Sequence, residues 1–344
     1  SGSASATAIF RPIAGAGTLI TAGDPGSGLA LINFNGADYV TFDGRPGGAG
    51  SAISWIIRNS RTASSVGPAI QFSNGATNDA LQYVRTESQN SSGTSGTVYI
   101  SSYPLWAAGN NNILIQNCDI TKYSSATTTH VNAIYAYGQT ANPNSYISIL
   151  NNNIHSFTPA ITSEATGVTV TGTGLNTNYG DHWTISGNSF YLDCAEQQLY
   201  RYTVINFIPG LGSGANTISN NFIGGTAPLC GGSTWASSVS GAGNTIQTFE
   251  GIYVTAGSTA ITGNTIQSIS LTGTSGTSFG AIHLANGSSS GTYTITDNLI
   301  GSSGTCNSVQ NAGQWKTVGI WCDNTCGAIS VSNNTIANMT VTNA

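Results

Sequence analysis

The side chains that could carry out chemistry are few, and the densest group of them lies in one segment. Charged residues make up 6% of the 344 residues, against about 25% in an average protein. The group consists of Asp181, His182, Trp183, Asp193, Glu196 and Arg201. Two carboxylates can hydrolyse a glycosidic bond, and Arg201, between two tyrosines, could bind a sugar acid. The alternative is a loop that packs over the protein body and is held there by Cys194.

Motifs that would establish an enzyme or a metal site are missing from the sequence. The Asn-x-Asp, Asp-Asp and Gly-His-Gly elements of polygalacturonase-type enzymes have no counterpart outside a repeated turn. The only lysines, Lys122 and Lys316, do not lie among clustered acids, as a polysaccharide lyase would need. His130 and His155 stand alone, and no pair of histidines has the spacing of metal ligands. We therefore expect no metal, no cofactor and no catalytic residue.

The six cysteines fit disulfides better than a zinc site. Cys322 and Cys326 have C-x3-C spacing, but no second pair and no nearby His accompany them. A chain poor in Lys and rich in Ser, Thr and Asn is typical of an exported protein, in which disulfides persist. We expect one bridge within Cys306, Cys322 and Cys326 and another between Cys194 and Cys230, although the sequence leaves the connectivity open.

The overall composition excludes several classes of protein. The net charge is −5 and there is no basic patch, so we expect no nucleic-acid partner. No window approaches the roughly 20 apolar residues of a membrane span. The first residues lack a charged-then-apolar leader, so we expect any signal peptide to lie outside this sequence. A hydrophobic content of 39%, spread at short intervals, favours a packed core over a disordered chain.

The elements that must position these side chains come from a repeat. One motif has the form I-x-(N/G/D)-(N/C)-x-(I/F), and its first residues are 34, 36, 33, 43, 34 and 36 positions apart. The seven copies occupy residues 115–120, 149–154, 185–190, 218–223, 261–266, 295–300 and 331–336. Asn at a turn can adopt left-handed backbone angles and can hydrogen-bond along a ladder of identical neighbours. Seven copies in phase favour a structural role for the motif.

A second motif, a small residue followed by an aliphatic one, alternates with the first and defines an outward row. If the aliphatic residue points inward, the residue after it points outward. These outward residues are Asn33, Gln71, Tyr99, Tyr135, Thr169, Asn206, Tyr253, His283 and Trp321. Aromatic rings pack well against the C–H groups of sugars. The candidate glycan-binding residues are therefore Tyr99, Tyr135, Tyr253, His283 and Trp321, although the same rings could simply pack against one another.

Short strands separated by Gly, Asn and Ser clusters leave no room for helices, so the repeat predicts a solenoid. We expect an all-β fold, a single right-handed parallel β-helix of about nine coils of ~34 residues, each strand about 4.8 Å from its copy in the next coil. Residues 1–344 would form one domain. Residues 1–30 would be an N-terminal coil or cap, 30–344 the regular coils, and 172–202 and 224–246 loop insertions.

The sequence also resembles a known superfamily. The stretches FNGADYVTFDGRPGG (34–48), WIIRNS (55–60) and AIQFSNGATND (69–79) resemble repeat regions of large secreted surface proteins of Bacteroidota, within the right-handed parallel β-helix (pectate-lyase-like) superfamily. The resemblance implies adhesin-like chains exported by a type IX route. The final coil has no polar cap, and uncapped solenoid ends expose strand edges. We therefore expect the chain to continue beyond residue 344, or another subunit to stack there.

The leading functional hypothesis is a non-enzymatic, exported cell-surface protein that acts as a structural or adhesive element or as a filament segment. Its expected partners are copies of itself, neighbouring domains of a longer chain, and surface glycans. The alternative is a polysaccharide-degrading β-helix enzyme, a lyase or a glycoside hydrolase, that acts at the 181–202 segment. The two hypotheses differ in whether two acids share a groove with Arg201.

Overall fold

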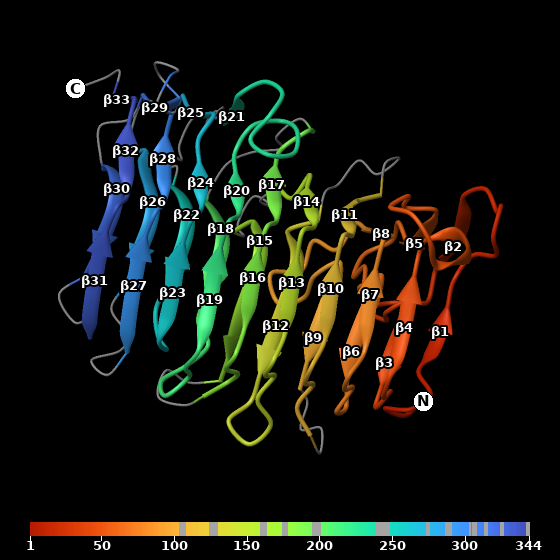
Figure 1. Cartoon of the computed structure of the whole chain (residues 1–344). Coiled ribbons are helices and arrows are strands. Elements are labelled where there is room, and N and C mark those ends of the chain that lie inside the picture. Colours follow the sequence, from red (N-terminus) through yellow and green to blue (C-terminus); the bar gives the residue numbers. More distant parts are fainter. Residues whose placement is uncertain are drawn as a thin grey trace.

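The computed structural model describes most of the chain, and its regular structure is almost entirely β-strand (Figure 1). The described residues are 1–102, 108–123, 130–158, 164–173, 178–194, 201–237, 248–272, 276–285, 291–302, 304, 308–312, 316–323 and 327–341. One short 3-10 helix, Pro46–Gly48, interrupts the strands. Within these ranges the strands form four parallel sheets of 10, 10, 9 and 4 strands. The predicted all-β parallel solenoid is confirmed.

Sheet 1 has ten strands, each paired in parallel with its copy one coil away. Its strands are β1 (Ala8–Phe10), β4 (Val40–Asp43), β7 (Ala80–Gln82), β10 (Leu114–Gln116), β13 (Ser148–Leu150), β16 (Thr184–Ser186), β19 (Asn216–Ser219), β23 (Thr259–Thr262), β27 (Thr292–Thr296) and β31 (Ala328–Ser332). The first residue of each copy of the Asn motif pairs with the first residue of the next, from Ile115 to Val331. The repeat therefore sets the register.

Sheet 2 follows sheet 1 across the turn that the Asn motif forms. Its strands are β2 (Leu19–Gly23), β5 (Trp55–Asn59), β8 (Val84–Ser88), β11 (Asp119–Lys122), β14 (Asn153–His155), β17 (Ser189–Tyr191), β20 (Phe222–Ile223), β24 (Thr265–Ile266), β28 (Leu299–Gly301) and β32 (Thr335–Ala337). Residues 1–30 thus contribute β1 and β2, the first strand of each ten-stranded sheet.

Sheet 3 contains the longest strands and holds the predicted outward row. Its strands are β3 (Ile32–Asn35), β6 (Ile70–Ser73), β9 (Val98–Ser101), β12 (Asn132–Gly138), β15 (Thr166–Gly172), β18 (Arg201–Phe207), β22 (Thr248–Val254), β26 (Ser278–Leu284) and β30 (Thr317–Cys322).

Sheet 4 is shorter and begins only in the second half of the chain. Its strands are β21 (Trp235–Ser237), β25 (Ile269–Leu271), β29 (Val309–Asn311) and β33 (Met339–Val341). The two segments expected as loop insertions therefore carry strands, because 172–202 includes β16 and β17, and 224–246 includes β21. In β21, Trp235 is fully buried and its ring meets those of Tyr202 and Phe249 edge-on, at 5.1 and 5.4 Å. This aromatic contact holds the segment against the core.

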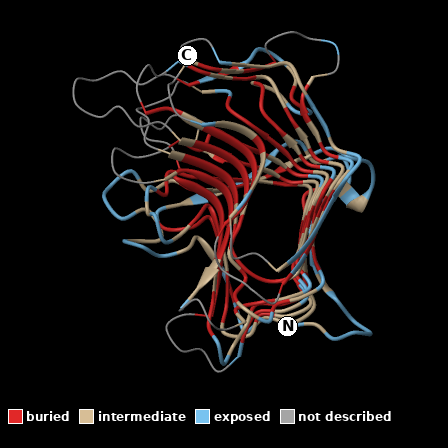
Figure 2. Cartoon of the chain, turned by 90° about the vertical axis from the view of Figure 1, so that its left-hand side faces the viewer, coloured by how far each residue is buried: buried red, intermediate tan, exposed pale blue. Residues whose placement is uncertain are grey.

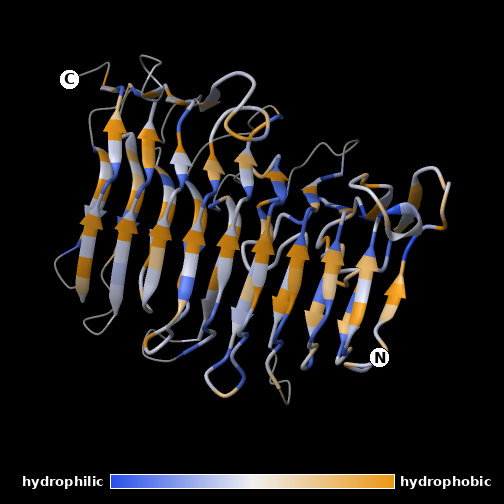
Figure 3. Cartoon of the chain, in the orientation of Figure 1, coloured by the Kyte–Doolittle hydropathy of each residue, from blue (hydrophilic) through white to orange (hydrophobic). Residues whose placement is uncertain are grey.

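The core is a continuous apolar column inside the stacked coils (Figures 2 and 3). Its inward side chains alternate with outward ones, as strand geometry requires. The alternation breaks once per coil in sheet 3, where two consecutive residues such as Val204 and Ile205 both belong to the core. At this break the first residue is often Gly, since a Cβ at Gly251 would lie 2.6 Å from the Ala281 carbonyl oxygen. At Gly251 the small residue of the second motif is thus a steric requirement, whereas the coil of Val204 accommodates a larger side chain at the same place.

The Asn motif carries the expected ladder. Its third residue has a left-handed φ, as at Asn151 (54°) and Asn220 (54°). The next residue is a buried Asn whose Nδ2 donates to Oδ1 of its counterpart one coil on. The rungs run Asn152, Asn188, Asn221, Asn264, Asn298 and Asn334, at 2.8–3.0 Å. Because each Nδ2 also donates to a main-chain carbonyl, the motif is structural.

The predicted Cys194–Cys230 disulfide is wrong. Cys230 is a free, buried thiol whose Sγ lies 3.8 Å from the carbonyl oxygen of Thr265, in the following coil. Leu229 and Cys230 both have left-handed φ angles, 60° and 57°, in a turn whose Leu229 N–H donates to Ser189 at the start of β17. The other predicted bridge involves Cys306 and Cys326, which lie outside the described residues.

Candidate functional site

The pairing register of sheet 3 places the predicted outward residues in one row. Partner by partner, the row runs Asn33, Gln71, Tyr99, Tyr135, Thr169, Asn206, Tyr253, His283 and Trp321. We call this set the aromatic row. Its register follows the prediction from the second motif, residue for residue.

Several rings of the aromatic row touch one another. Tyr99 and Tyr135 lie 6.0 Å apart between ring centroids, and Tyr253 meets His283 edge-on at 5.0 Å. His283 stacks on Trp321 at 3.8 Å with an interplanar angle of 5°. Tyr135 and His283 are 6% and 5% exposed, whereas Tyr99, Tyr253 and Trp321 are half-buried. The half-buried rings are the ones that a ligand can reach.

Charged side chains gather beside the C-terminal half of the row. Arg201, at the start of β18, donates from Nη2 to Glu250 at 2.6 Å and lies 3.2 Å from Glu164 through Nε. Its guanidinium carbon is 5.6 Å from the centroid of the Tyr253 ring. Glu250 also accepts a hydrogen bond from Nδ1 of His283 at 2.9 Å. Arg201 therefore shares one site with two acids and two rings of the row.

The two acids beside Arg201 have pKa values shifted in opposite directions. Burial raises the pKa of Glu164, although the charge of Arg201 opposes the shift. Burial also acts to raise the pKa of Glu250, but the hydrogen bond from His283 and the charge of Arg201 outweigh it and lower that pKa. Opposed shifts in neighbouring carboxyl groups are the arrangement from which acid–base pairs are built.

A hollow of about 240 Å³ opens next to this cluster, over the break in strand alternation. It is lined on one side of the break by Asn132, Glu164 and Thr166, and on the other by Tyr135, Thr169 and Asn206. Oδ1 of Asn206 is buried and has no hydrogen-bond partner in the part of the chain that the structure describes. The hollow thus offers hydroxyl, amide and carboxyl groups, one of them an acceptor that lacks a donor.

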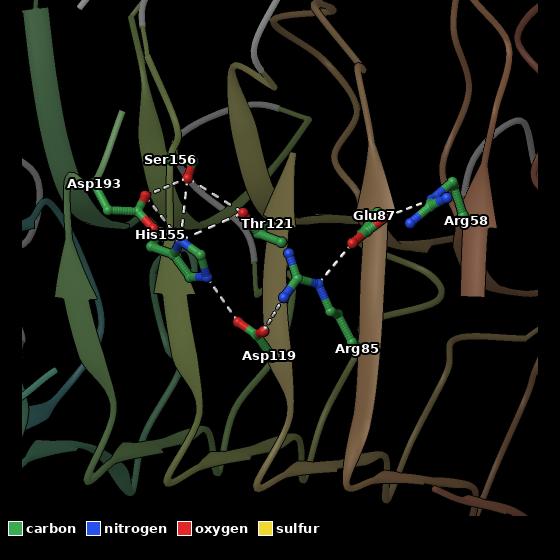
Figure 4. Close-up of polar contacts among 8 residues, drawn as sticks. All are labelled: Arg58, Arg85, Glu87, Asp119, Thr121, His155, Ser156 and Asp193. Atoms are coloured by element: carbon green, nitrogen blue, oxygen red, sulfur yellow. Dashed lines mark hydrogen bonds and ion pairs between the residues drawn. The ribbon is translucent and has the colours of Figure 1, made fainter. Parts of the chain in front are cut away.

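A second polar cluster lies on the outer face of sheet 2 (Figure 4). Charges of alternating sign follow one another along the solenoid, with two members in β8, and we call the chain they form the ionic ladder. Its members are Arg58, Glu87, Arg85, Asp119, His155 and Asp193. Arg85 connects Glu87 at 2.6 Å with Asp119 at 3.2 Å. A groove of about 360 Å³ lies beside the C-terminal end of the ladder.

His155 does not stand alone, contrary to the sequence prediction. Its Nε2 donates to Asp119 at 2.7 Å and its Nδ1 to Asp193 at 3.0 Å, while the Tyr191 ring stacks on it at 4.6 Å. Burial acts to lower the pKa of His155, but the hydrogen bonds and charges of Asp119 and Asp193 prevail and raise it to about 9. At neutral pH this residue is an imidazolium ion held between two carboxylates.

Together with His155 and Asp193, Ser156 forms a Ser-His-Asp group that resembles a catalytic triad. Its Oγ lies 3.1 Å from Nδ1 of His155 and donates to Asp193 at 2.5 Å, and its φ of 60° is left-handed. A triad histidine must accept the proton of the serine, whereas His155 already carries both protons. Ser156 is also only 3% exposed. The geometry therefore favours a stabilising role for the ion pairs of His155 over a role of Ser156 as a nucleophile.

The structure distributes the residues of the predicted 181–201 patch over several places. Asp181 and His182 lie in the turn before β16, where His182 stacks on Tyr146 at 4.3 Å. Trp183 is 1% exposed and donates from Nε1 to the carbonyl oxygen of Asn144. Asp193 ends the ionic ladder, Arg201 joins the aromatic row, and Glu196 lies outside the described residues. These residues are close in sequence, but they lie beside β16, β17 and β18, which belong to three different sheets. Spacing along the chain alone therefore did not reveal that they are separated.

Within the described ranges, no group of three or more His, Cys, Asp or Glu side chains is arranged to hold a metal ion. The same ranges contain no helix with the length and apolarity needed to cross a bilayer.

Comparisons with known proteins concern the fold. No protein-family profile matches the chain, and no curated protein matches it. Two solved structures of PfbA, a surface adhesin of Streptococcus pneumoniae, are similar at 13% and 12% identity, with TM-scores of 0.40 and 0.38. The alignments cover 96% and 97% of this chain and 89% and 82% of those chains.

A tailspike protein is also similar in structure to this chain. The Dettilon tailspike protein gp208 is 14% identical over 94% of this chain and 61% of its own, with a TM-score of 0.32. Identities and TM-scores this low do not support a transfer of function. The resemblance to pectate-lyase-like proteins and to Bacteroidota surface proteins stays a prediction.

Proposed function

We propose that this chain is a non-enzymatic β-solenoid protein that binds glycans along the outer face of sheet 3. The observation that carries the proposal is the aromatic row, in which the half-buried rings of Tyr99 and Tyr253 flank a hollow lined by hydroxyl and amide groups. Flat rings beside a few polar groups are typical of sugar sites. Neighbouring positions of the row are about 4.8 Å apart, comparable with one sugar residue in an extended chain.

In this proposal the protein is exported and stands at the cell surface, as a spacer or adhesin that contacts copies of itself or neighbouring domains. A low proportion of charged residues supports that role, because the stability then rests on stacked apolar coils and ladder hydrogen bonds that salt affects little. Labelling of intact cells with an antibody against the chain tests the location, and a signal that appears only after lysis contradicts it.

The binding test uses immobilised polysaccharides and a double variant, Tyr253→Ala with Trp321→Ala. We expect retention to fall at least tenfold, since each aromatic ring that packs against a sugar contributes about 1 kcal/mol or more to binding. Tyr146→Ala is the matched control, because this tyrosine is 52% exposed and lies at a turn of sheet 1. Circular dichroism and thermal unfolding establish that both variants fold. Unchanged retention of the double variant contradicts the proposal.

A second candidate is a glycoside hydrolase centred on Glu164 and Glu250. It is favoured by one observation, that both acids contact Arg201 and have pKa values shifted in opposite directions. Against it, the guanidinium lies between the carboxylates, where a hydrolase needs space for the sugar or for a water molecule. Release of reducing ends from a bound polysaccharide, abolished by Glu164→Gln, would favour the hydrolase over the binding protein.

A further inference from the structure

The cations of sheet 3 near the hollow are already paired. Arg201 contacts both Glu164 and Glu250, and His283 bonds to Glu250 and lies 3.5 Å from Asp323. Lys316 is exposed, but its Nζ lies 3.2 Å from the Trp321 centroid, three coils beyond Asn206 in the row. A ligand carboxylate in the hollow would therefore have to displace an existing ion pair.

The polar groups inside the hollow call for a donor. Oδ1 of Asn206 has no partner among the described residues, and Glu164 lines the same hollow. An acceptor that is removed from water without a donor costs about 1–3 kcal/mol. A sugar hydroxyl or an amide N–H satisfies such an acceptor, whereas a ligand carboxylate cannot donate and would be repelled by Glu164.

From these contacts we infer that the glycan bound over the hollow is uncharged, rich in hydroxyl or amide groups, and lies along the solenoid axis from Tyr135 past Asn206 to Tyr253. The inference rests on the proposed function and deepens it. It departs from the sequence-based idea that Arg201 binds a sugar acid, because Arg201 has two carboxylate partners within the protein. In this arrangement the Asn206 side chain rotates so that its buried Oδ1 reaches the hollow and accepts a hydrogen bond from the sugar. Tyr253 supports the ring of the next sugar residue.

The experiment measures binding of the full chain to neutral polysaccharides, to amide-bearing neutral polysaccharides and to uronic-acid polymers, at low and high NaCl. We expect binding to one or more uncharged polymers with an affinity that changes less than twofold with salt, since few ions are released when no charges pair. Uronic-acid polymers that bind more tightly than every neutral one, with an affinity that falls as salt rises, overturn the inference and leave the proposed function standing. Failure of every polymer to bind overturns both.

Variants at Asn206 locate the interaction. Asn206→Ala removes the acceptor and should weaken neutral-glycan binding about tenfold, while Asn206→Asp keeps an acceptor oxygen at the same place and should weaken it by less than about threefold. Asn33→Ala is the matched control, because Asn33 occupies the same row five coils earlier. Equal binding by Asn206→Ala and the unchanged protein, with both folded, overturns the inference.

Discussion

His155 and His283 both lie between two carboxylates on the outside of the solenoid, yet their surroundings differ. His155 bonds to Asp119 and Asp193 within the ionic ladder, where each charge meets one of opposite sign. His283 bonds to Glu250, which Arg201 also holds. Asp119 also pairs with Arg85, as Glu250 does with Arg201, but among the described residues His155 is the cation that pairs with Asp193. Asp193 therefore depends more on its histidine than Glu250 depends on His283.

The two faces also differ in what they leave unsatisfied. On sheet 2 the ladder connects its charges into one continuous series from Arg58 to Asp193 (Figure 4). On sheet 3 a buried acceptor of Asn206 has no partner among the described residues, and it borders a hollow. Fully paired polar groups rigidify a structure, whereas a buried acceptor without a donor carries an energetic cost that a ligand with a donor can relieve. Incomplete pairing, more than the residue types present, therefore separates a candidate binding face from a structural one.

The largest expected effect comes from His155→Leu. This change removes the cation between Asp119 and Asp193 and should lower the free energy of unfolding by about 3 kcal/mol at neutral pH, the usual cost of breaking a buried ion pair. His283→Leu should cost only about 1 kcal/mol, because Glu250 keeps its hydrogen bond from Arg201. Chemical denaturation of both variants measures the difference. Equal losses would remove the distinction between the two faces.

The dependence of stability on pH should follow His155. A histidine in the unfolded chain has a pKa near 6.5, whereas that of folded His155 is raised to about 9. Below pH 6.5 both states bind the proton and the stabilisation is fully present. Between pH 6.5 and about 9 the folded state holds a proton that the unfolded chain has lost, so stability falls with rising pH, by about 3 kcal/mol in total.

Two comparisons sharpen this pH prediction. His155→Leu should remove the decline between pH 6.5 and 9. His130 should produce the opposite slope on the acid side, because burial lowers its pKa to about 4 and the unfolded chain then binds a proton that the folded state does not. Unfolding curves measured from pH 5 to pH 9 test both slopes. A stability that stays constant from pH 6.5 to 9 in the unchanged protein contradicts the account of the ladder.

The fold and the register of the aromatic row could be predicted from the sequence because both follow from local periodicity. The Asn motif fixes where each coil turns, and the small-aliphatic pair fixes where sheet 3 breaks its alternation. From Ile32 to Ile320 these two signals place every residue of the row, since strand alternation leaves no freedom between them. The sequence therefore predicts well those features, such as turn positions and strand register, that the residues of a single coil determine.

Contacts that depend on the course of loops could not be predicted in the same way. Asp119 and His155 belong to successive coils. The register of β11 with β14 pairs Asp119 with Asn153, so His155 lies two residues further along the neighbouring strand, diagonally opposite Asp119. Asp193 reaches His155 from beyond the end of β17. The Cys230 thiol lies against the carbonyl oxygen of Thr265 after a turn with two successive left-handed residues. The signal that could have found the His155 cluster is the Asn motif itself, applied to the residues that follow it.

The smallest expected effect comes from Arg58→Gln, at the N-terminal end of the ionic ladder. Arg58 pairs with Glu87 and lies over the Tyr123 ring at 4.5 Å, but Glu87 keeps Arg85 at 2.6 Å. We expect a loss of about 1 kcal/mol, measured by chemical denaturation, and no change in glycan binding. If the ladder acts as a connected unit, the double variant with His155→Leu should lose less than the sum of the two single losses. Strict additivity would mean that its ion pairs act separately, and that the two faces differ only in what surrounds each histidine.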